Sequence, residues 1–247
     1  GTLPDPVAAA RVCEQAGAQS IVCHLREDRR HIQDEDVRRL KDVITTRFNL
    51  EMSMASDIVR VALAVRPDQV TLVPERRQEL TTGGGLDVTR YWRKIARLVR
   101  SFSTSRISVS LFLDPVRSQL QAARDCGVTI VALHTGHFAN ATTLSMRAKA
   151  LNALQHAAAI GAEWGLEVAA GHGLDGTNVQ EVAAIAHIRE LNIGFSIITR
   201  ALTVGLASAV EEMVALMASP SAVAPRRMAS RALQSKMVRV AHALNTA

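Results

Sequence analysis

Aromatic residues are scarce in this chain: Phe, Trp and Tyr together make up 3% of its 247 residues. Hydrophobic residues nevertheless reach 48%, so a large core has to be built from Val, Ile, Leu and Ala. No apolar run approaches the ~20 residues that span a bilayer. The chain also begins without the charged and apolar regions of a secretory signal. We therefore expect neither a membrane-spanning segment nor a secretory signal, and the length is usual for one α/β barrel.

Cysteine is also rare. Cys13, Cys23 and Cys126 lack the spacing of metal ligands, and their odd number argues against a disulfide framework. We therefore expect a reduced, cytoplasmic protein.

Acidic residues are absent beyond Glu212. Five of the six net positive charges can be assigned to the last part of the chain, so the body before it is nearly neutral and no nucleic-acid partner is expected. Those five cations are Arg226, Arg227, Arg231, Lys236 and Arg239.

Residues 219–247 form a basic extension of separate character. Leu233, Met237, Val240 and Leu244 recur at helical spacing, which predicts a terminal helix packed on the barrel or on a neighbouring subunit. A helix on a membrane surface or on nucleic acid, and disorder, are the alternatives.

Two similar units mark the organisation of residues 1–218. Asp5-Pro6-Val7 and Asp114-Pro115-Val116 each predict a helix start, with Asp as the N-cap and Pro in the first turn. Gly17 and Gly127 follow each helix where a left-handed C-terminal cap is needed.

Short apolar runs follow such helices and predict strands buried on both faces. Helices separate them, which is typical of consecutive βαβ units. A (β/α)8 TIM barrel needs eight strands, and the chain opens on a helix, so the first strand is absent from the given chain or the barrel is closed differently. The seven predicted strands are 20–25, 48–52, 69–75, 107–113, 129–134, 166–171 and 189–194.

Three histidines share one offset from a glycine. His24, His134 and His172 each follow a glycine by seven residues, which places all three imidazoles at the carboxyl ends of strands, the catalytic end of such barrels. Glu51 and Glu75 close two further strands. The alternatives are structural histidines and a zinc site, although no HxH or HExxH pair is present.

Loops after the strands suit a phosphorylated ligand. Gly173 and Gly194 fall where barrels often bind phosphate, because glycine lets the backbone approach an anion closely. The segment 76–85 is long, polar and rich in glycine, which is typical of a lid over a substrate and also of a merely solvated loop.

Several motifs together resemble the pyridoxine 5′-phosphate synthase family, in its order and spacing, from about Gly1 to Met217. The octapeptide His24-Leu-Arg-Glu-Asp-Arg-Arg-His31 is the most specific of them. The others are Asn49-Leu-Glu-Met52, Val73-Pro-Glu-Arg-Arg-Gln-Glu-Leu-Thr-Thr82 with Gly84-Gly-Leu-Asp87, His134-Thr-Gly136, Ala170-Gly-His-Gly-Leu174 and Glu190-Leu-Asn-Ile-Gly194.

The resemblance implies a (β/α)8 barrel assembled as a homo-octamer. It implies condensation of 1-deoxy-D-xylulose 5-phosphate with 3-amino-2-oxopropyl phosphate to pyridoxine 5′-phosphate, phosphate and water, without metal or organic cofactor. By position, His24 and Glu51 match the family's proton acceptors and His172 matches its proton donor. The matches to substrate contacts are Arg26, His31, Thr81, Gly173 and Gly194.

The chain departs from the family at three places. The family's first strand, with an Asn-x-Asp-His motif, has no counterpart in the given chain. A Glu of the family is replaced by Ala132, and a phosphate-contacting His is replaced by Phe195. A diverged paralogue that binds a phosphorylated ligand with impaired catalysis is therefore the alternative to a working synthase, and a scaffold role through the basic tail is a third hypothesis.

Overall fold

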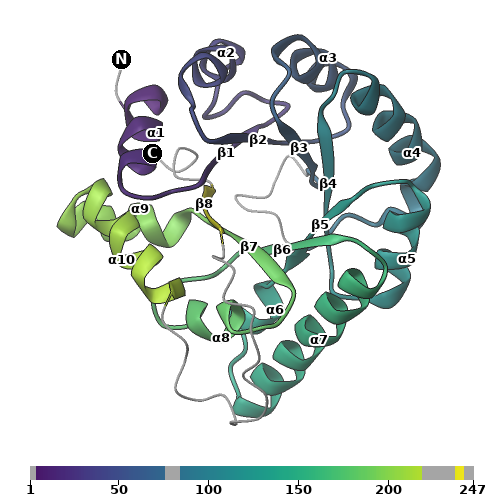
Figure 1. Cartoon of the computed structure of the whole chain (residues 1–247), viewed down its shortest axis with the longest axis vertical. Coiled ribbons are helices and arrows are strands. Elements are labelled where there is room, and N and C mark those ends of the chain that lie inside the picture. The colour runs from purple at the N-terminus through teal and green to yellow at the C-terminus, as the bar shows by residue number, and fades with distance from the viewer. Residues whose placement is uncertain (1–3, 76–83, 219–236, 242–247) are drawn as a thin grey trace.

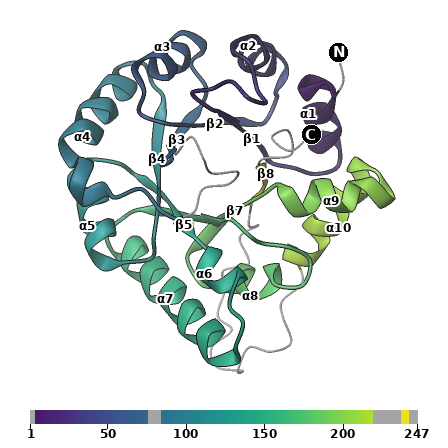
Figure 2. The same cartoon turned by 180° about the vertical axis from the view of Figure 1, so that it is seen from behind.

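In the computed structural model the chain forms a closed barrel of eight parallel strands surrounded by helices (Figures 1 and 2). The structure describes residues 4–75, 84–218 and 237–241. The strands are β1 (Ser20–Leu25), β2 (Arg47–Met52), β3 (Gln69–Leu72), β4 (Ser108–Leu113), β5 (Ile130–His134), β6 (Glu167–Gly171), β7 (Ile188–Ile193) and β8 (Met237–Ala241).

The helices lie outside the strands and cover them from solvent (Figure 1). None in the described part of the chain is long and apolar enough to cross a membrane. They are α1 (Pro6–Gln15), α2 (Asp34–Val43), α3 (Ser56–Val65), α4 (Val88–Thr104), α5 (Arg117–Asp125), α6 (Gly136–Ala139), α7 (Leu144–Glu163), α8 (Val179–Ala183), α9 (Phe195–Val204) and α10 (Leu206–Ala218).

All seven predicted strands are confirmed as β1 to β7, to within three residues at each end. The first predicted helix is confirmed too: the Asp5 side chain accepts a hydrogen bond from the Val7 amide, and Gly17 has φ +100°. Local signals sufficed here because capping and glycine conformation depend on neighbouring residues.

The helix start predicted at Asp114-Pro115-Val116 is wrong in its cap and its first residue. Helix α5 begins at Arg117, its N-cap is Val116, and no side chain caps it. The Asp114 carboxylate accepts a hydrogen bond from His134 on the next strand instead. A tertiary contact therefore takes the group that the sequence offers as a cap.

The seam of the barrel is closed by the C-terminal part of the chain. Strand β8 pairs in parallel with β7 on one side and with β1 on the other, and Val240 is the Cα partner of Ile193 and of Ile21. The helix expected at 219–247 is thus wrong for residues 237–241, and the rest of that extension lies outside the described residues. Strand pairing of this segment is favoured over a helix because β1 and β7 would otherwise present unpaired backbone groups.

Strand residues alternate between the barrel interior and the helix layer. On β3, Val70 and Leu72 are fully buried against the helices, whereas Gln69 and Thr71 belong to the polar interior. There the Thr71 hydroxyl donates to Asn49 Oδ1 at 2.9 Å. The main apolar core lies between the strands and the helix layer, and the barrel interior holds polar side chains together with a small apolar cluster.

Candidate active site

The two predicted proton acceptors lie side by side on neighbouring strands. His24 on β1 and Glu51 on β2 are Cα partners in the parallel ladder. Partners in register point to the same face of a sheet, so these two side chains share the barrel interior. His24 is 4% exposed.

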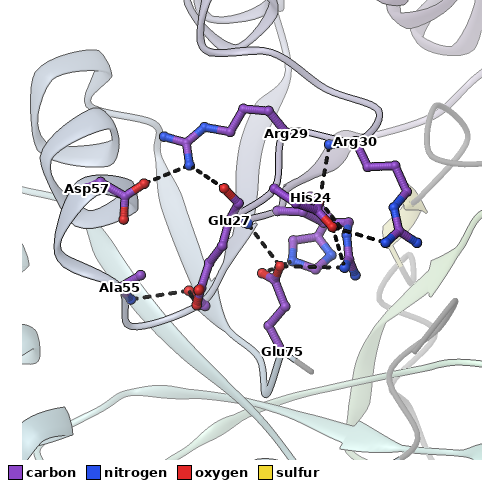
Figure 3. A network of polar contacts seen from close by, with 10 residues as sticks. His24, Glu27, Arg29, Arg30, Ala55, Asp57 and Glu75 are labelled. Carbon is purple, nitrogen blue, oxygen red and sulfur yellow. Dashed lines mark hydrogen bonds and ion pairs between the residues drawn. The ribbon is translucent and has the colours of Figure 1, made fainter. Parts of the chain in front are cut away.

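A second acidic residue, Glu75 in the loop after β3, contacts His24. His24 Nε2 lies 3.5 Å from Glu75 Oε2, and the Glu27 amide donates to Glu75 Oε1 at 2.9 Å (Figure 3). Burial by itself would raise the pKa of Glu75, but the hydrogen bonds from His24 and Glu27 hold it below its usual value. Glu75 therefore presents a negative charge to the imidazole. The sequence pattern predicted Glu75 at the end of a strand but did not predict its contact with His24.

Arg26 completes this side of the site. Its guanidinium binds Asp28 through two hydrogen bonds of 3.0 Å and lies 3.7 Å from Glu75. The side-chain hydrogen bond from Arg26 also holds the pKa of Asp28 well below its ordinary value. The predicted phosphate-binding arginine is thus pre-oriented by carboxylates, with its side chain 9% exposed.

The predicted proton donor lies on the opposite side, directly after β6. His172 has φ +88°, a region that non-glycine residues rarely adopt. The Thr135 hydroxyl bridges the carbonyls of Gly171 and His172 at 2.6 and 2.5 Å, and the Thr135 amide donates to Gly171 O at 2.9 Å. These hydrogen bonds hold the unusual backbone in place.

His134 packs against His172, and Asp114 in turn binds His134. The imidazoles of His134 and His172 lie 5.0 Å apart, centroid to centroid, at 63°. His134 Nδ1 is 2.9 Å from Asp114 Oδ1, and the Gly85 amide donates to the same oxygen at 3.2 Å. The hydrogen bond with His134 holds the pKa of Asp114 below its ordinary value. The sequence pattern identified His134 as a strand-end residue, but it predicted Asp114 as a helix cap, which is wrong.

A cavity of about 940 Å³ opens beside these groups. Of the predicted residues, Glu51, His172, Gly173 and Gly194 line it. His24 is not among its lining residues, but its register partner Glu51 is. The cavity therefore joins the proposed acceptor side to the proposed donor side.

The two substituted positions also face this cavity. Ala132 lies in a buried apolar cluster with Val73, Phe112 and Ala169, and Phe195 is 65% exposed at the start of α9. Among the other predicted contacts, His31 lies in the loop after β1, and Thr81 falls outside the described residues.

One group of possible metal ligands occurs in the described residues. Ligand atoms of Asp114, His134 and His137 lie within 4.8 Å of one another, with His137 exposed. The three cysteines are buried, and burial raises the pKa of each thiol, to about 12 for Cys13. Thiolate ligands or nucleophiles are therefore disfavoured.

The closed parallel sheet and its surrounding helices define the class: an α/β-barrel protein, with histidine and glutamate side chains at the carboxyl ends of its strands. Solved structures agree on the fold. A 3-keto-L-gulonate-6-phosphate decarboxylase from Vibrio cholerae aligns with a TM-score of 0.59 at 16% identity, covering 84% of this chain and 90% of that one. A phosphoribosylanthranilate isomerase from Thermotoga maritima gives 0.56 at 11% identity, covering 85% and 93%.

Sequence comparison identifies the family. Residues 1–219 match the family described as "Pyridoxal phosphate biosynthesis protein PdxJ", and the chain belongs to it. The pyridoxine 5′-phosphate synthase of Geobacter metallireducens is 49% identical over 216 residues, which cover 87% of this chain and 90% of that protein. The synthase of Synechococcus sp. is 48% identical, with 88% and 87% covered. Strand β8 lies beyond the matched range.

Proposed function

We propose that this protein is a pyridoxine 5′-phosphate synthase. It condenses 1-deoxy-D-xylulose 5-phosphate with 3-amino-2-oxopropyl phosphate, releasing pyridoxine 5′-phosphate, phosphate and water. The single observation that carries the proposal is the placement of Glu51 and His172 on one cavity, with His24 in register beside Glu51.

The chemistry needs proton transfers at carbon and oxygen. Imidazoles titrate near neutral pH and can act as acid or base. In this proposal His24 and Glu51 accept protons and His172 donates one. Glu75 stabilises the imidazolium that forms when His24 takes a proton, because the carboxylate lies 3.5 Å from Nε2.

Phosphate groups bind at the cavity rim. Gly173 has φ +73°, and Gly194 precedes the N-terminus of the ten-residue helix α9. Backbone N–H groups at a helix start attract anions. Arg26, His31 and Thr81 contact the deoxyxylulose phosphate, with Arg26 already aligned by Asp28.

The proposal extends to the setting of the enzyme. It works in the cytoplasm as a homo-oligomer, an octamer like the family it resembles, and needs no metal or organic cofactor. Its partners are small phosphorylated molecules rather than nucleic acid or membrane.

The test is turnover by the purified full chain with the two phosphate substrates. We expect pyridoxine 5′-phosphate and inorganic phosphate in equal amounts, measured by chromatography and by phosphate assay. Glu51→Gln and His172→Asn should each lower kcat by roughly 10²–10⁴-fold, the usual contribution of one acid or base. Absence of product from the unmodified chain would reject the proposal.

A diverged paralogue is the second candidate, and the apolar surroundings of Ala132 favour it. The family has Glu there, and losing one electrostatic stabiliser typically costs about 10²–10³ in rate. The double variant Ala132→Glu, Phe195→His separates the candidates. An inactive chain that this pair makes active is an impaired synthase; one that stays inactive but binds phosphate esters supports the paralogue.

A further inference from the structure

The best-supported new role belongs to Asp114 and His134, which lie behind the proposed donor and outside the cavity lining. They come from adjacent strands: Asp114 directly follows β4, and His134 ends β5. Their hydrogen bond joins residues 20 positions apart. Neither residue is used by the reaction proposed above.

His134 contacts the ring of His172 and is not among the residues that line the cavity. The two rings meet edge to face at 5.0 Å, and Phe112 packs on them at 5.3 and 6.5 Å. Edge-to-face contacts of this kind restrict the plane of a ring. His172 is therefore held from one side by two rings, and its backbone is held by Thr135.

Gly136 shows how tight this arrangement is. A Cβ built there would overlap His134 Nε2 and lie 3.1 Å from His172 Cδ2. Only glycine lets the backbone pass this close to the two imidazoles. His134 Nε2 thus faces Gly136, while Nδ1 faces Asp114.

The hydrogen bond also selects one tautomer of His134. A carboxylate can only accept a hydrogen bond, so Nδ1 carries the proton. Nε2 then lies on the side of Gly136 and His172. An aspartate that fixes the tautomer and orientation of a histidine is a recurring device in acid–base sites.

We propose that Asp114 and His134 are positioning residues for the donor: Asp114 fixes the His134 ring, and His134 sets the plane of His172. The inference rests on the proposed function for its kinetic readout but not for its spectroscopic one. Because the pair lies outside the cavity lining, its loss should lower kcat while leaving substrate affinity intact.

The first experiment replaces Asp114 by Asn, which keeps the shape and removes the acceptor-only carboxylate. We expect kcat to fall roughly 10- to 100-fold, as when a residue that orients a catalytic or metal-bound ligand is lost, with KM for each substrate within about twofold. Asp125→Asn is the matched control, since its exposed carboxylate accepts a hydrogen bond from Gln121 on α5 and does not line the cavity. An unchanged kcat in Asp114→Asn would overturn the proposal.

Two substitutions of His134 separate positioning from packing. The amide nitrogen of Asn takes the place of Nδ1 and can still donate to Asp114, whereas Leu cannot. His134→Asn should retain clearly more activity than His134→Leu at similar folded fractions. Equal loss in the two variants would show that only bulk matters and would contradict the proposal.

The third readout does not need turnover. Nitrogen-15 spectra of histidine-labelled protein should show His134 protonated at Nδ1, and Asp114→Asn should change that tautomer and shift the His172 resonances. If the unmodified chain makes no product but these shifts occur, the proposed function fails and the positioning pair stands. If His172 does not respond, the pair fails whatever the activity.

A chelator distinguishes the remaining explanation. Activity that is lost on metal removal and restored by zinc would mean that Asp114, His134 and His137 form a metal site, which would overturn the positioning role. Activity that survives chelation supports it.

Discussion

The two sides of the cavity are built by different means. On the His24 side, charges surround the imidazole: Glu75 and Arg26 lie within 4 Å of one another, and Asp28 orients the arginine. On the His172 side the backbone is unusual, one ring packs on another, and Gly136 leaves no spare volume. The first side should tolerate changes of shape better than changes of charge, and the second the reverse.

Gly136→Ala is expected to have the largest effect, because it tests the close packing on the His172 side directly. The added methyl overlaps His134 and crowds His172, so we expect kcat to fall at least about 100-fold and stability to fall by roughly 1–3 kcal/mol, as in overpacked cores. Steady-state kinetics and chemical denaturation measure the two effects.

Gly165→Ala is the comparator for that change. Gly165 has φ +79° and no atom within 4 Å of an added Cβ, so only backbone strain is introduced. It should cost about 1 kcal/mol of stability and leave kcat unchanged. Similar kinetics for the two variants would remove the packing argument.

Val240→Pro tests the seam that borders the His24 side. The proline removes a backbone N–H from β8, where Val240 pairs with β1 and β7. We expect a loss of roughly 1–3 kcal/mol, the cost of an unsatisfied buried group, measured by thermal unfolding. Val240→Ile keeps the N–H and should unfold like the unmodified protein; equal behaviour of the two variants would mean that β8 contributes nothing.

Glu75→Gln changes charge but not shape on the His24 side. Without the carboxylate beside His24, kcat should fall about tenfold, roughly 1.4 kcal/mol of barrier. Glu163→Gln, the same change at an exposed end of α7, should have no effect. A larger loss from Glu75→Ala than from Glu75→Gln would show that shape matters here too.

The same variant should alter the acid response of stability. The folded-state pKa of Glu75 is lowered from 4.5, so its contribution is complete above pH 4.5 and is lost as the pH falls through the lowered value. The stability difference between unmodified protein and Glu75→Gln should therefore shrink on acidification. Urea unfolding at about pH 7 and about pH 3.5 measures it, and a difference that grows towards acid would contradict the assignment.

Asp57→Asn is expected to have the smallest effect. Asp57 accepts a 2.7 Å hydrogen bond from Arg29 at the rim of the charged network (Figure 3), but its side chain is 44% exposed. Exposed ion pairs contribute about 0–1 kcal/mol, so kcat should stay within about twofold. A larger loss would extend the functional network outward from Glu75.

Much of this molecule could be predicted from local patterns. Strands β1 to β7 appear as apolar runs, and His24, Glu51 and His172 appear as polar residues at their ends. Such signals are readable because strand burial and capping depend on near neighbours. Two predictions are wrong where a residue distant in sequence is the actual partner. Asp114 binds His134 instead of capping α5, and residues 237–241 pair with β7 as a strand instead of forming a helix.

The sequence by itself determined the order of strands and helices, the polar groups at the mouth, and the resemblance of residues 1–217 to the synthase family. Only the tertiary structure decided that Glu75 faces His24, that Asp114 serves His134, and that the C-terminal segment closes the barrel. The reason is physical. Composition and periodicity report what each segment can bury, whereas the partner of a charged side chain or an unpaired strand edge is set by register between segments far apart in the chain.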